Sequence, residues 1–203
     1  MKICSNCVMP ETSETLIFDK DKKCSVCTQI KQKEAINWKQ REESLDLLID
    51  QYRGKYEYDC IVPFSGGKDS TFTLWYLVTQ KKLKPLVIRF DHNFYRKNHE
   101  LNVQKVVSKL GVDFINYKTN FEIVKKTMME SLIRRGDFCW HCHVGVSALP
   151  INIAIEKKVP LIFYGEPSSE YSSYNDYEEM EEMDNERFNK VSNLGINAED
   201  MFE

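Results

Sequence analysis

The chain turns at Ser65-Gly66-Gly67-Lys68-Asp69-Ser70, between an apolar run of residues 59–64 and an amphipathic run of residues 71–77. The apolar run predicts a strand, and the amphipathic run predicts a helix. Because glycine has no Cβ, the two glycines allow a tight turn and let backbone N–H groups close on an anion at the helix start. Lys68 adds a positive charge, and the two serines add hydroxyl donors. The stretch therefore predicts a phosphate-binding loop.

Two common phosphate-loop patterns do not fit this loop. A Walker A loop needs a glycine where this chain has Val62, and a serine or threonine where it has Asp69. The dinucleotide-binding pattern needs spaced glycines, whereas the glycines here are adjacent. The loop instead resembles the SGGxDS loop of the PP-loop ATP pyrophosphatases. That resemblance implies that the loop holds the β- and γ-phosphates of ATP, which is cut between its α- and β-phosphates so that AMP activates a substrate oxygen.

Strand and helix patterns alternate along the chain. Apolar runs predict further strands at residues 85–90, 112–117 and 160–164, and helical spacing predicts helices from the loop to residue 82 and at residues 101–110, 121–134 and 151–155. This alternation predicts an α/β fold with a doubly wound, Rossmann-like parallel sheet. Ligands of such sheets bind at the carboxyl ends of the strands, so we expect the loop, Asp91-His92 and Gly165-Glu166 to converge there.

Four cysteines near the amino terminus form two C-x-x-C pairs, Cys4 with Cys7 and Cys24 with Cys27, separated by sixteen residues. This spacing is typical of four thiolates around one tetrahedral Zn²⁺. A short strand at residues 15–19 is expected between the pairs. Because the segment is too short to bury a core, metal binding would supply its folding free energy. We expect a structural zinc site in a small zinc-ribbon-like segment.

A second group of metal-binding residue types occurs in Phe138-Cys139-Trp140-His141-Cys142-His143, which is expected to form a loop. Adjacent ligands cannot all reach one ion from a short loop. Four interpretations stay open: a metal site completed by a partner or a missing segment, a redox or sulfur-carrying thiol pair, an active-site loop in which His141 or His143 handles protons, and a packed loop without chemistry. Cys60, in the first strand, is expected in the core.

The composition limits the class of protein. A chain of 203 residues with a net charge of −3 can bury one sizeable core, and it has no general attraction for nucleic acid. No apolar run reaches membrane-spanning length, and no signal-peptide pattern begins the chain. Seven cysteines without a secretory signal favour a reducing compartment. We therefore expect a cytoplasmic enzyme.

Three segments are expected: a zinc-knuckle segment at residues 1–30, a linker helix at 31–54 and a PP-loop domain at 55–203. Beyond Glu166 the composition becomes acidic, with many carboxylates and few aliphatic residues at residues 178–186, which predicts a solvated segment. This leaves the sheet without a clear final layer. Two explanations stay open: the chain is a carboxy-terminally truncated fragment, or a partner, for example in a homo-oligomer, covers the exposed face.

Several motifs occur together in one order along nearly the whole chain. These are Cys4-x-x-Cys7-Val8-Met9-Pro10, Phe18-Asp19, Cys24-x-x-Cys27, residues 65–70, Gly136-Asp137, Trp140-His141-Cys142-His143, Pro160-Leu161, Gly165-Glu166 and Glu170-Tyr171. The ordered set resembles the N-acetyl sugar amidotransferases of bacterial surface-polysaccharide and flagellin glycosylation, which include the pseudaminic- and legionaminic-acid and O-antigen enzymes. Members of that family usually continue well past the end of this chain.

The resemblance implies an ATP-dependent conversion of an acetamido group on a sugar or nucleotide-linked sugar into an acetamidino group. The loop residues Ser65, Gly66, Gly67, Lys68 and Ser70 would hold the pyrophosphate part of ATP, and Asp69 would orient the loop or a Mg²⁺ ion. Arg89, Phe90 and Asp91 would border the adenosine. Catalytic roles fall to Lys68, Asp69, Cys139, His141, Cys142, His143 and Glu166, the last in contact with Mg²⁺ or the acceptor. No segment resembles a glutaminase, so a separate subunit would supply ammonia.

Two alternatives stay open. The tRNA-thiolating PP-loop enzymes also combine zinc knuckles with a PP-loop, but they need three clustered thiols and a basic surface for RNA, whereas Cys139 and Cys142 have only the buried Cys60 as a third partner. The other alternative is a zinc-stabilised nucleotide-binding subunit without catalysis of its own.

Overall fold

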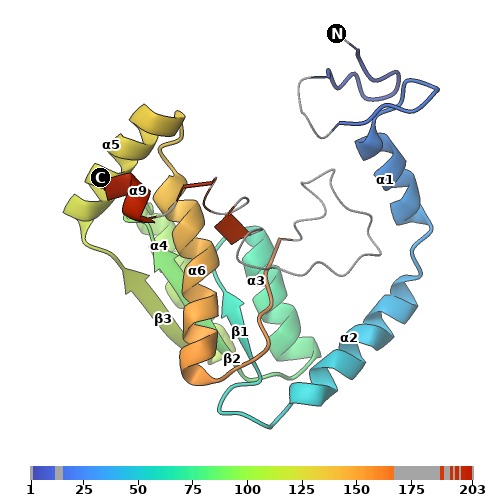
Figure 1. Cartoon of the computed structure of the whole chain (residues 1–203). Helices are drawn as coiled ribbons and strands as arrows, with labels where there is room; N and C mark the ends of the chain where they lie inside the picture. Colours follow the sequence, from blue (N-terminus) through green and yellow to red (C-terminus); the bar gives the residue numbers. More distant parts are fainter. Residues whose placement is uncertain are drawn as a thin grey trace. The chain divides into compact units, whose positions relative to one another are not determined.

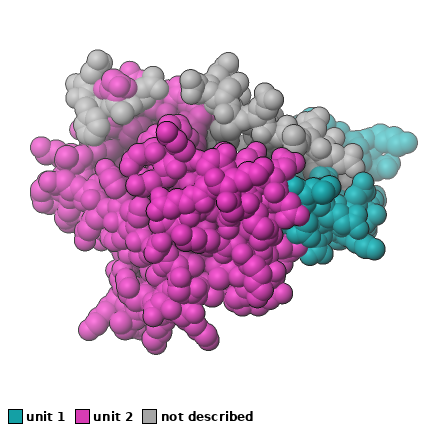
Figure 2. Space-filling view, turned by 90° about the horizontal axis from the view of Figure 1, so that it is seen from below, with its two compact units in different colours: residues 1–48, 166–182 teal, residues 49–165, 183–203 magenta. Residues whose placement is uncertain are grey.

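The structure is a computed structural model that describes residues 2–11, 16–166, 188–189, 193, 195–196 and 198–202. The chain forms two compact units (Figure 2). Unit 1 contains residues 1–48 and 166–182, and unit 2 contains residues 49–165 and 183–203. The predicted acidic segment at 178–186 and the Glu170-Tyr171 motif lie outside the described residues.

The segment that holds Cys4, Cys7, Cys24 and Cys27 is called the cysteine knuckle. Two helices follow Cys24 along the chain (Figure 1), namely α1 (Ser25–Glu34) and α2 (Trp38–Tyr52). The prediction of one linker helix over residues 31–54 was wrong. The side-chain oxygen of Asn37 accepts a hydrogen bond from the Gln40 N–H at 3.2 Å, so it caps the start of a new helix. The predicted strand at residues 15–19 is represented by an antiparallel bridge between Phe18 and Cys24, and its first residue lies outside the described part.

Unit 2 is built on a parallel sheet of three strands in the order β1 (Cys60–Pro63), β2 (Pro85–Asp91) and β3 (Asp113–Lys118). The segment between β1 and β2 holds α3 (Lys68–Trp75), which continues as a π-helical turn over Tyr76–Gln80. The segment between β2 and β3 holds α4 (Lys97–Leu110), which ends at Gly111 in the left-handed conformation, as predicted. The predicted alternation of parallel strands and helices is confirmed.

The fourth predicted strand, at residues 160–164, is reduced to a single bridge. Ile61 of β1 pairs in parallel with Ile162. The Ile61 N–H donates to the Leu161 carbonyl at 2.8 Å, and the Phe163 N–H donates to the Ile61 carbonyl at 2.9 Å. Because β2 occupies one edge of β1, this segment occupies the other. The strand order therefore reverses at β1, which makes the carboxyl end of β1 the topological switch point of a doubly wound sheet.

Two helices lie between β3 and the bridging segment, namely α5 (Phe121–Arg135) and α6 (Trp140–Lys157). Figure 1 shows α6 in front of the sheet and α4 behind it. A core of buried apolar side chains joins α6 to β1 and β2: Ile61, Leu86, Ile88, Ala154 and Val159. The expectation that residues 138–143 form a loop was wrong, because α6 begins at Trp140, eleven residues before the predicted helix.

Among the described residues, none of the helices is by itself long and apolar enough to cross a membrane. By length and composition alone, α5 and α6 together are long and apolar enough, as a pair bent by 116°.

Candidate functional site

The phosphate loop begins where β1 ends. The Phe64 N–H donates to the Ile88 carbonyl at 2.8 Å, which continues the sheet up to the residue before Ser65. Gly66 then has a φ of +81°, in the left-handed region. A Cβ on Gly66 would lie 2.5 Å from Val103 Cγ2 and 2.9 Å from His99 Nε2. Glycine is therefore required at this position by its backbone conformation and by the close approach of α4.

The start of α3 is open to an anion. Gly67 occupies the N-cap position with extended backbone angles, and none of the side chains that the structure describes caps this end of the helix. The Thr71 N–H makes the first helical bond, to the Gly67 carbonyl at 3.1 Å, so the N–H groups of residues 68–70 precede the ladder of intrahelical bonds. Such N–H groups, together with the helix dipole, favour bound phosphate.

The polar side chains of the loop surround this helix start. The Ser65 and Ser70 hydroxyl oxygens lie 3.1 Å apart, and the Gly67 N–H donates to Ser65 Oγ at 3.3 Å. Lys68 Nζ lies 2.9 Å from Asp69 Oδ1, and the Lys68 side chain is 90% exposed. The structure thus brings the six predicted loop residues together at the switch point, with the lysine in a position to meet a phosphate from solvent.

The bridging segment closes one side of the loop. A Cβ on Gly165 would lie 3.0 Å from the Ser70 backbone N and Cα, so the chain after residue 164 touches the first turn of α3. This contact confirms the expected convergence of Gly165 with the loop at the carboxyl edge of the sheet. Glu166 follows Gly165 and is exposed. Its contact with Mg²⁺ or an acceptor stays a prediction.

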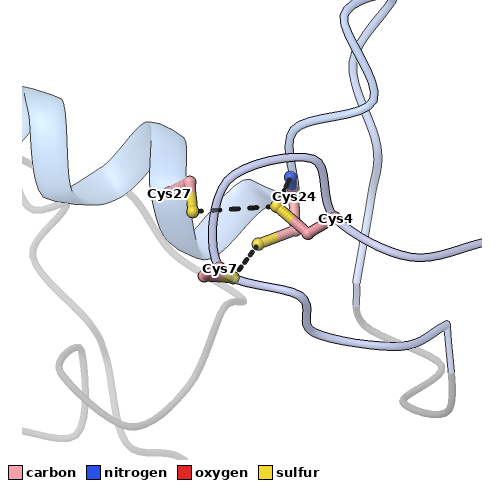
Figure 3. Close-up of side chains that lie close together, drawn as sticks. All are labelled: Cys4, Cys7, Cys24 and Cys27. Atoms are coloured by element: carbon pink, nitrogen blue, oxygen red, sulfur yellow. Dashed lines mark hydrogen bonds between the residues drawn. The ribbon is translucent and has the colours of Figure 1, made fainter.

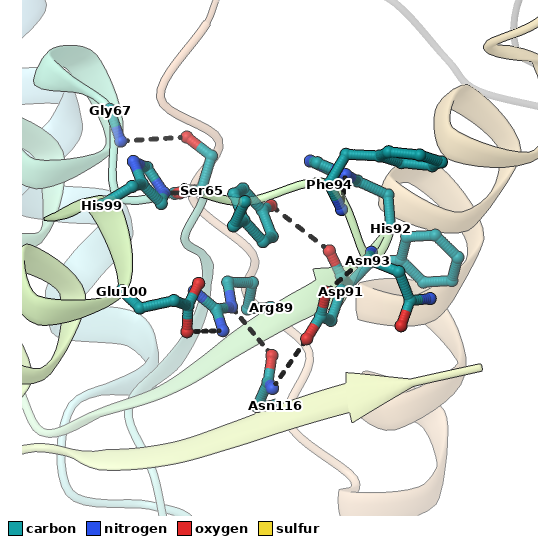
Figure 4. A network of polar contacts seen from close by, with 12 residues as sticks. Ser65, Gly67, Arg89, Asp91, His92, Asn93, Phe94, His99, Glu100 and Asn116 are labelled. Atoms are coloured by element: carbon teal, nitrogen blue, oxygen red, sulfur yellow. Dashed lines mark hydrogen bonds and ion pairs between the residues drawn. The ribbon is translucent and has the colours of Figure 1, made fainter. Parts of the chain in front are cut away.

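Arg89 is buried and bound within the protein rather than exposed for adenosine. Its side chain is 2% exposed, and its two terminal nitrogens donate to the two carboxylate oxygens of Glu100 on α4, each at 2.8 Å. Its Nε donates to Asn116 Oδ1 on β3 at 2.8 Å (Figure 4). Three donors of the guanidinium therefore hold α4 and β3 to β2, and the predicted contact of Arg89 with adenosine finds no support in this placement.

Phe90 and Asp91 end β2 on the same edge. The Phe90 ring stacks on Tyr117 with centroids 6.4 Å apart, and α6 approaches it so closely at Gly145 that a Cβ there would overlap the ring. Asp91 is buried and accepts hydrogen bonds from the Asn93 N–H at 2.8 Å and from Asn116 Nδ2 at 3.3 Å. Both residues lie at the predicted edge, and their contact with adenosine stays a prediction.

The four amino-terminal cysteines come together as predicted (Figure 3). All four Sγ atoms lie within 4.8 Å of one another, with Cys4 and Cys27 3.8 Å apart and Cys7 and Cys24 3.5 Å apart. Four sulfurs at the usual Zn–S distance of about 2.3 Å from one ion form a tetrahedron with edges of about 3.8 Å. The sulfur set therefore fits a tetrahedral metal ion.

Hydrogen bonds to sulfur support this metal site. The Asn6 and Cys24 N–H groups donate to Cys4 Sγ at 3.4 and 3.3 Å, and Asn6 Nδ2 donates to Cys27 Sγ at 3.3 Å. Backbone hydrogen bonding, first from Cys7, lowers the pKa of Cys4 to about 6, whereas burial raises the pKa of Cys24 to about 12. With so high a pKa, the Cys24 thiol needs a bound cation to be deprotonated near neutral pH. Among the described residues, these four cysteines form the one group of three or more residues that could hold a metal ion.

The second cysteine group lies at the start of α6. Cys139 is the N-cap residue, its N–H donates to Asp137 Oδ1 at 2.8 Å, and Cys142 and His143 lie in the first turn. Trp140 is buried against Ile196 and Met201, and its indole N–H donates to the Asn193 carbonyl at 2.8 Å. The first residue of α6 is therefore anchored by packing and by a hydrogen bond. Among the described residues these thiols and imidazoles do not assemble into a metal-type cluster.

Burial governs the protonation of this second group. It raises the pKa of Cys142 to about 11, with a further contribution from Cys139, and it raises the pKa of Cys139. Both thiols are thus protonated near neutral pH, unlike reactive thiolates. Burial, with His92 and His143 nearby, lowers the pKa of His141, and neither of its buried ring nitrogens has a hydrogen-bond partner among the described residues. The chemical roles of His141, Cys139 and Cys142 stay predictions.

Sequence reasoning missed the residues of α4 and β3 that support the loop, namely His99, Glu100, Val103 and Asn116. Their contacts join segments far apart in the chain, so no local motif marks them. Glu100, the acidic residue in the first turn of α4, is a weak sequence signal of its own role. A carboxylate at this position can pair with a charged residue of the preceding strand, which here is Arg89.

Comparisons with known proteins give distant similarities. No protein-family model matches the chain. An uncharacterized protein of Methanocaldococcus jannaschii is 28% identical over 141 residues, which are 68% of this chain and 50% of that protein, so the chain spans about half the length of this curated relative.

Two solved structures are similar in part. An NH3-dependent NAD synthetase from Campylobacter jejuni, in complex with a nitrate ion, is 14% identical with a TM-score of 0.49, over 70% of this chain and 64% of that one. A U34-tRNA thiolase from Methanococcus maripaludis with its 4Fe-4S cluster is 16% identical with a TM-score of 0.44, over 84% of this chain and 56% of that one. Both TM-scores lie below 0.5, so the fold assignment rests on the sheet order and the loop themselves.

Proposed function

We propose that unit 2 binds ATP on the loop at residues 65–70 and cleaves it between the α- and β-phosphates to adenylate an oxygen of an acceptor. The observation that carries the proposal is the start of α3. Gly66 is left-handed, Gly67 leaves the helix end without a side-chain cap, and Lys68 is exposed beside it, all at the switch point of the sheet. This combination suits a polyphosphate that enters from solvent.

The acceptor that we propose is the acetamido group of an N-acetyl nucleotide-linked sugar. Its carbonyl oxygen attacks the α-phosphorus, the α–β P–O bond breaks, and pyrophosphate leaves. Ammonia then adds to the carbon of the adenylated imidate, loses a proton, and expels AMP together with the former amide oxygen. The product is an acetamidino group. The support for this acceptor is the ordered set of cysteine, histidine and glycine motifs along the chain.

Each polar residue of the site has a role in this proposal. Lys68 neutralises the charge that builds on the leaving pyrophosphate, and Asp69 orients Lys68 or a Mg²⁺ ion that bridges phosphate oxygens. His141, whose pKa is lowered by burial and whose ring nitrogens have no partner in the described part of the chain, is the candidate to accept a proton from the attacking ammonia. Zn²⁺ in the cysteine knuckle has a structural role. A separate subunit in the cytoplasm supplies the ammonia.

Thiolation of tRNA is the second candidate, favoured by the third C-x-x-C pair, Cys139 and Cys142, on α6. In that reaction a sulfur would replace an oxygen that has been adenylated in the same way. Burial raises the pKa of both thiols, so in this reaction a bound cation would be needed to make them thiolates near neutral pH.

Pyrophosphate release tests the proposal. Wild-type protein is incubated with ATP, Mg²⁺ and ammonium, and either UDP- and CMP-linked N-acetyl sugars or tRNA with a sulfur donor. Release with an N-acetyl sugar, together with a mass decrease of about 1 Da in the sugar as NH replaces O, is the expected result. Pyrophosphate release only in the mixture with tRNA and a sulfur donor would contradict the sugar amidotransferase activity and support tRNA thiolation. Binding of ATP without release in any mixture would support a nucleotide-binding subunit instead.

A further inference from the structure

We propose that His99, which lies on α4 outside the phosphate loop, is the positioning residue that holds the loop in its anion-binding conformation. The inference rests on the proposed binding of ATP by this loop. It assigns a role to a residue that does not itself need to touch the nucleotide.

The contact between His99 and the loop is short and directional. His99 Nε2 lies 2.7 Å from the Ser65 carbonyl oxygen (Figure 4). A carbonyl oxygen can only accept a hydrogen bond, so Nε2 carries the proton. The carbonyl of Ser65 and the N–H of Gly66 belong to the same planar trans peptide and point in opposite directions. By holding the carbonyl toward α4, His99 turns the Gly66 N–H away from α4.

The loop rests directly on α4 at the same place. Gly66 follows the held carbonyl, and its missing Cβ is what lets His99 and the buried Val103 approach. The left-handed φ of +81° at Gly66 is one of several conformations that glycine reaches at little cost. A hydrogen bond at the preceding peptide selects this conformation before a ligand arrives, so the binding of phosphate does not have to order the turn.

His99 is itself held in place from two sides. The Tyr95 ring stacks on the imidazole with centroids 4.7 Å apart and an angle of 4° between the planes. Arg89 lies 4.7 Å from the Tyr95 centroid and binds both carboxylate oxygens of Glu100, the next residue along α4. The buried arginine therefore fixes the helix turn and the ring that orient His99. Buried Arg89 therefore supports the loop indirectly, through His99.

The test compares ligands that differ in the phosphates held by the loop. Wild type, His99→Phe and His99→Gln are titrated with ATP and with AMP, which lacks the β- and γ-phosphates. Phenylalanine keeps a ring against Tyr95 but has no donor, so we expect about fivefold weaker binding of ATP, the equivalent of one hydrogen bond, with AMP binding unchanged. Glutamine keeps an N–H donor, so we expect it to retain ATP binding within about twofold.

Leu83→Ala is the control for a general loss of stability. Leu83 is 5% exposed and lies just before β2, at the sheet edge opposite the loop. This variant should unfold at lower denaturant concentration and bind both nucleotides like wild type. If His99→Phe does not fold, His99→Asn, whose amide is too short to reach Ser65, takes its place.

The outcomes separate this inference from the proposed function. If His99→Phe binds ATP like wild type, or loses ATP and AMP binding equally, His99 does not position the loop. If His99→Gln is as weak as His99→Phe, the hydrogen bond is not the cause. If wild type binds no ATP, the proposed function fails, and the inference fails with it.

Discussion

The cysteine knuckle of unit 1 and the phosphate loop of unit 2 differ in what their polar groups face. In the knuckle, four sulfur atoms lie within 4.8 Å of one another, and nearby N–H groups donate to them. In the loop, the helix end at Gly67 has no side-chain cap, and Lys68 is 90% exposed. Four sulfur ligands that surround one point, as in the knuckle, suit a structural metal ion that stays bound. Donor groups exposed to solvent, as in the loop, suit a substrate that must enter and leave.

The third C-x-x-C pair, Cys139 and Cys142, sharpens this contrast. Its spacing is the same as in the knuckle, but its thiols lie at the start of a helix whose tryptophan is buried. Spacing alone therefore does not make a metal site. A second pair must be brought opposite the first, and the chain achieves this only at Cys4, Cys7, Cys24 and Cys27 among the described residues.

The largest expected effect is the loss of the metal from the knuckle. Cys24→Ser should reduce zinc from one ion per chain to none and unfold the amino-terminal segment, because a structural zinc contributes on the order of 10 kcal/mol to such small folds. Metal analysis and circular dichroism measure this change. Cys142→Ser, with the same atom replaced in the other pair, should retain one zinc. Zinc lost equally from both variants would remove the distinction between the two pairs.

The next largest effect is on turnover at the open loop. Lys68→Ala should lower the rate of pyrophosphate release by about 10²–10³-fold, which is typical when one group that stabilises developing charge is removed. Lys109→Ala, an exposed lysine in the last turn of α4, is the control and should turn over like wild type. Equal rates in the two variants would show that Lys68 does not meet the leaving phosphate.

A moderate effect is expected from the ion pair that supports the loop. Glu100→Gln leaves the charge of Arg89, which is 2% exposed, without its partner, but Glu100 itself is 39% exposed. We expect a loss of about 2 kcal/mol in the free energy of unfolding, below the value for a fully buried pair. Urea titration measures it. Glu122→Gln, which breaks an exposed pair with Lys125, should cost less than about 0.5 kcal/mol.

The smallest expected effect is a pH dependence of the free energy of unfolding, which comes from His92 and His141. Burial lowers the pKa of both His92 and His141 in the folded protein. The unfolded chain therefore takes up protons first as the pH falls below about 6.5, and stability that is present at pH 7 is lost in that range. His141→Gln should reduce this pH dependence between pH 7 and 5. If the variant keeps the same pH dependence of stability, protonation of His141 does not contribute to it.

The sequence was sufficient for features that depend on local pattern. The order of strands and helices, the loop at residues 65–70 and the cysteine tetrad each have a spacing or periodicity that a short stretch can reveal. Contacts between distant segments were not accessible in this way. The burial of Arg89 depends on Glu100 and Asn116 from other elements. The burial of Trp140 at the start of α6 depends on Ile196 and Met201, more than fifty residues further along the chain.

The claim that the open loop binds the phosphates of ATP is tested most directly by one pair of glycine substitutions. Gly66→Ala and Gly111→Ala both place a Cβ on a left-handed residue, at φ +81° and +64°, but only the first lies in the loop, and nothing lies within 4 Å of a Cβ at Gly111. The affinity of each variant for ATP is measured by calorimetry. We expect at least about tenfold weaker binding of ATP by Gly66→Ala and unchanged binding by Gly111→Ala. Binding of ATP by Gly66→Ala with wild-type affinity would contradict the claim.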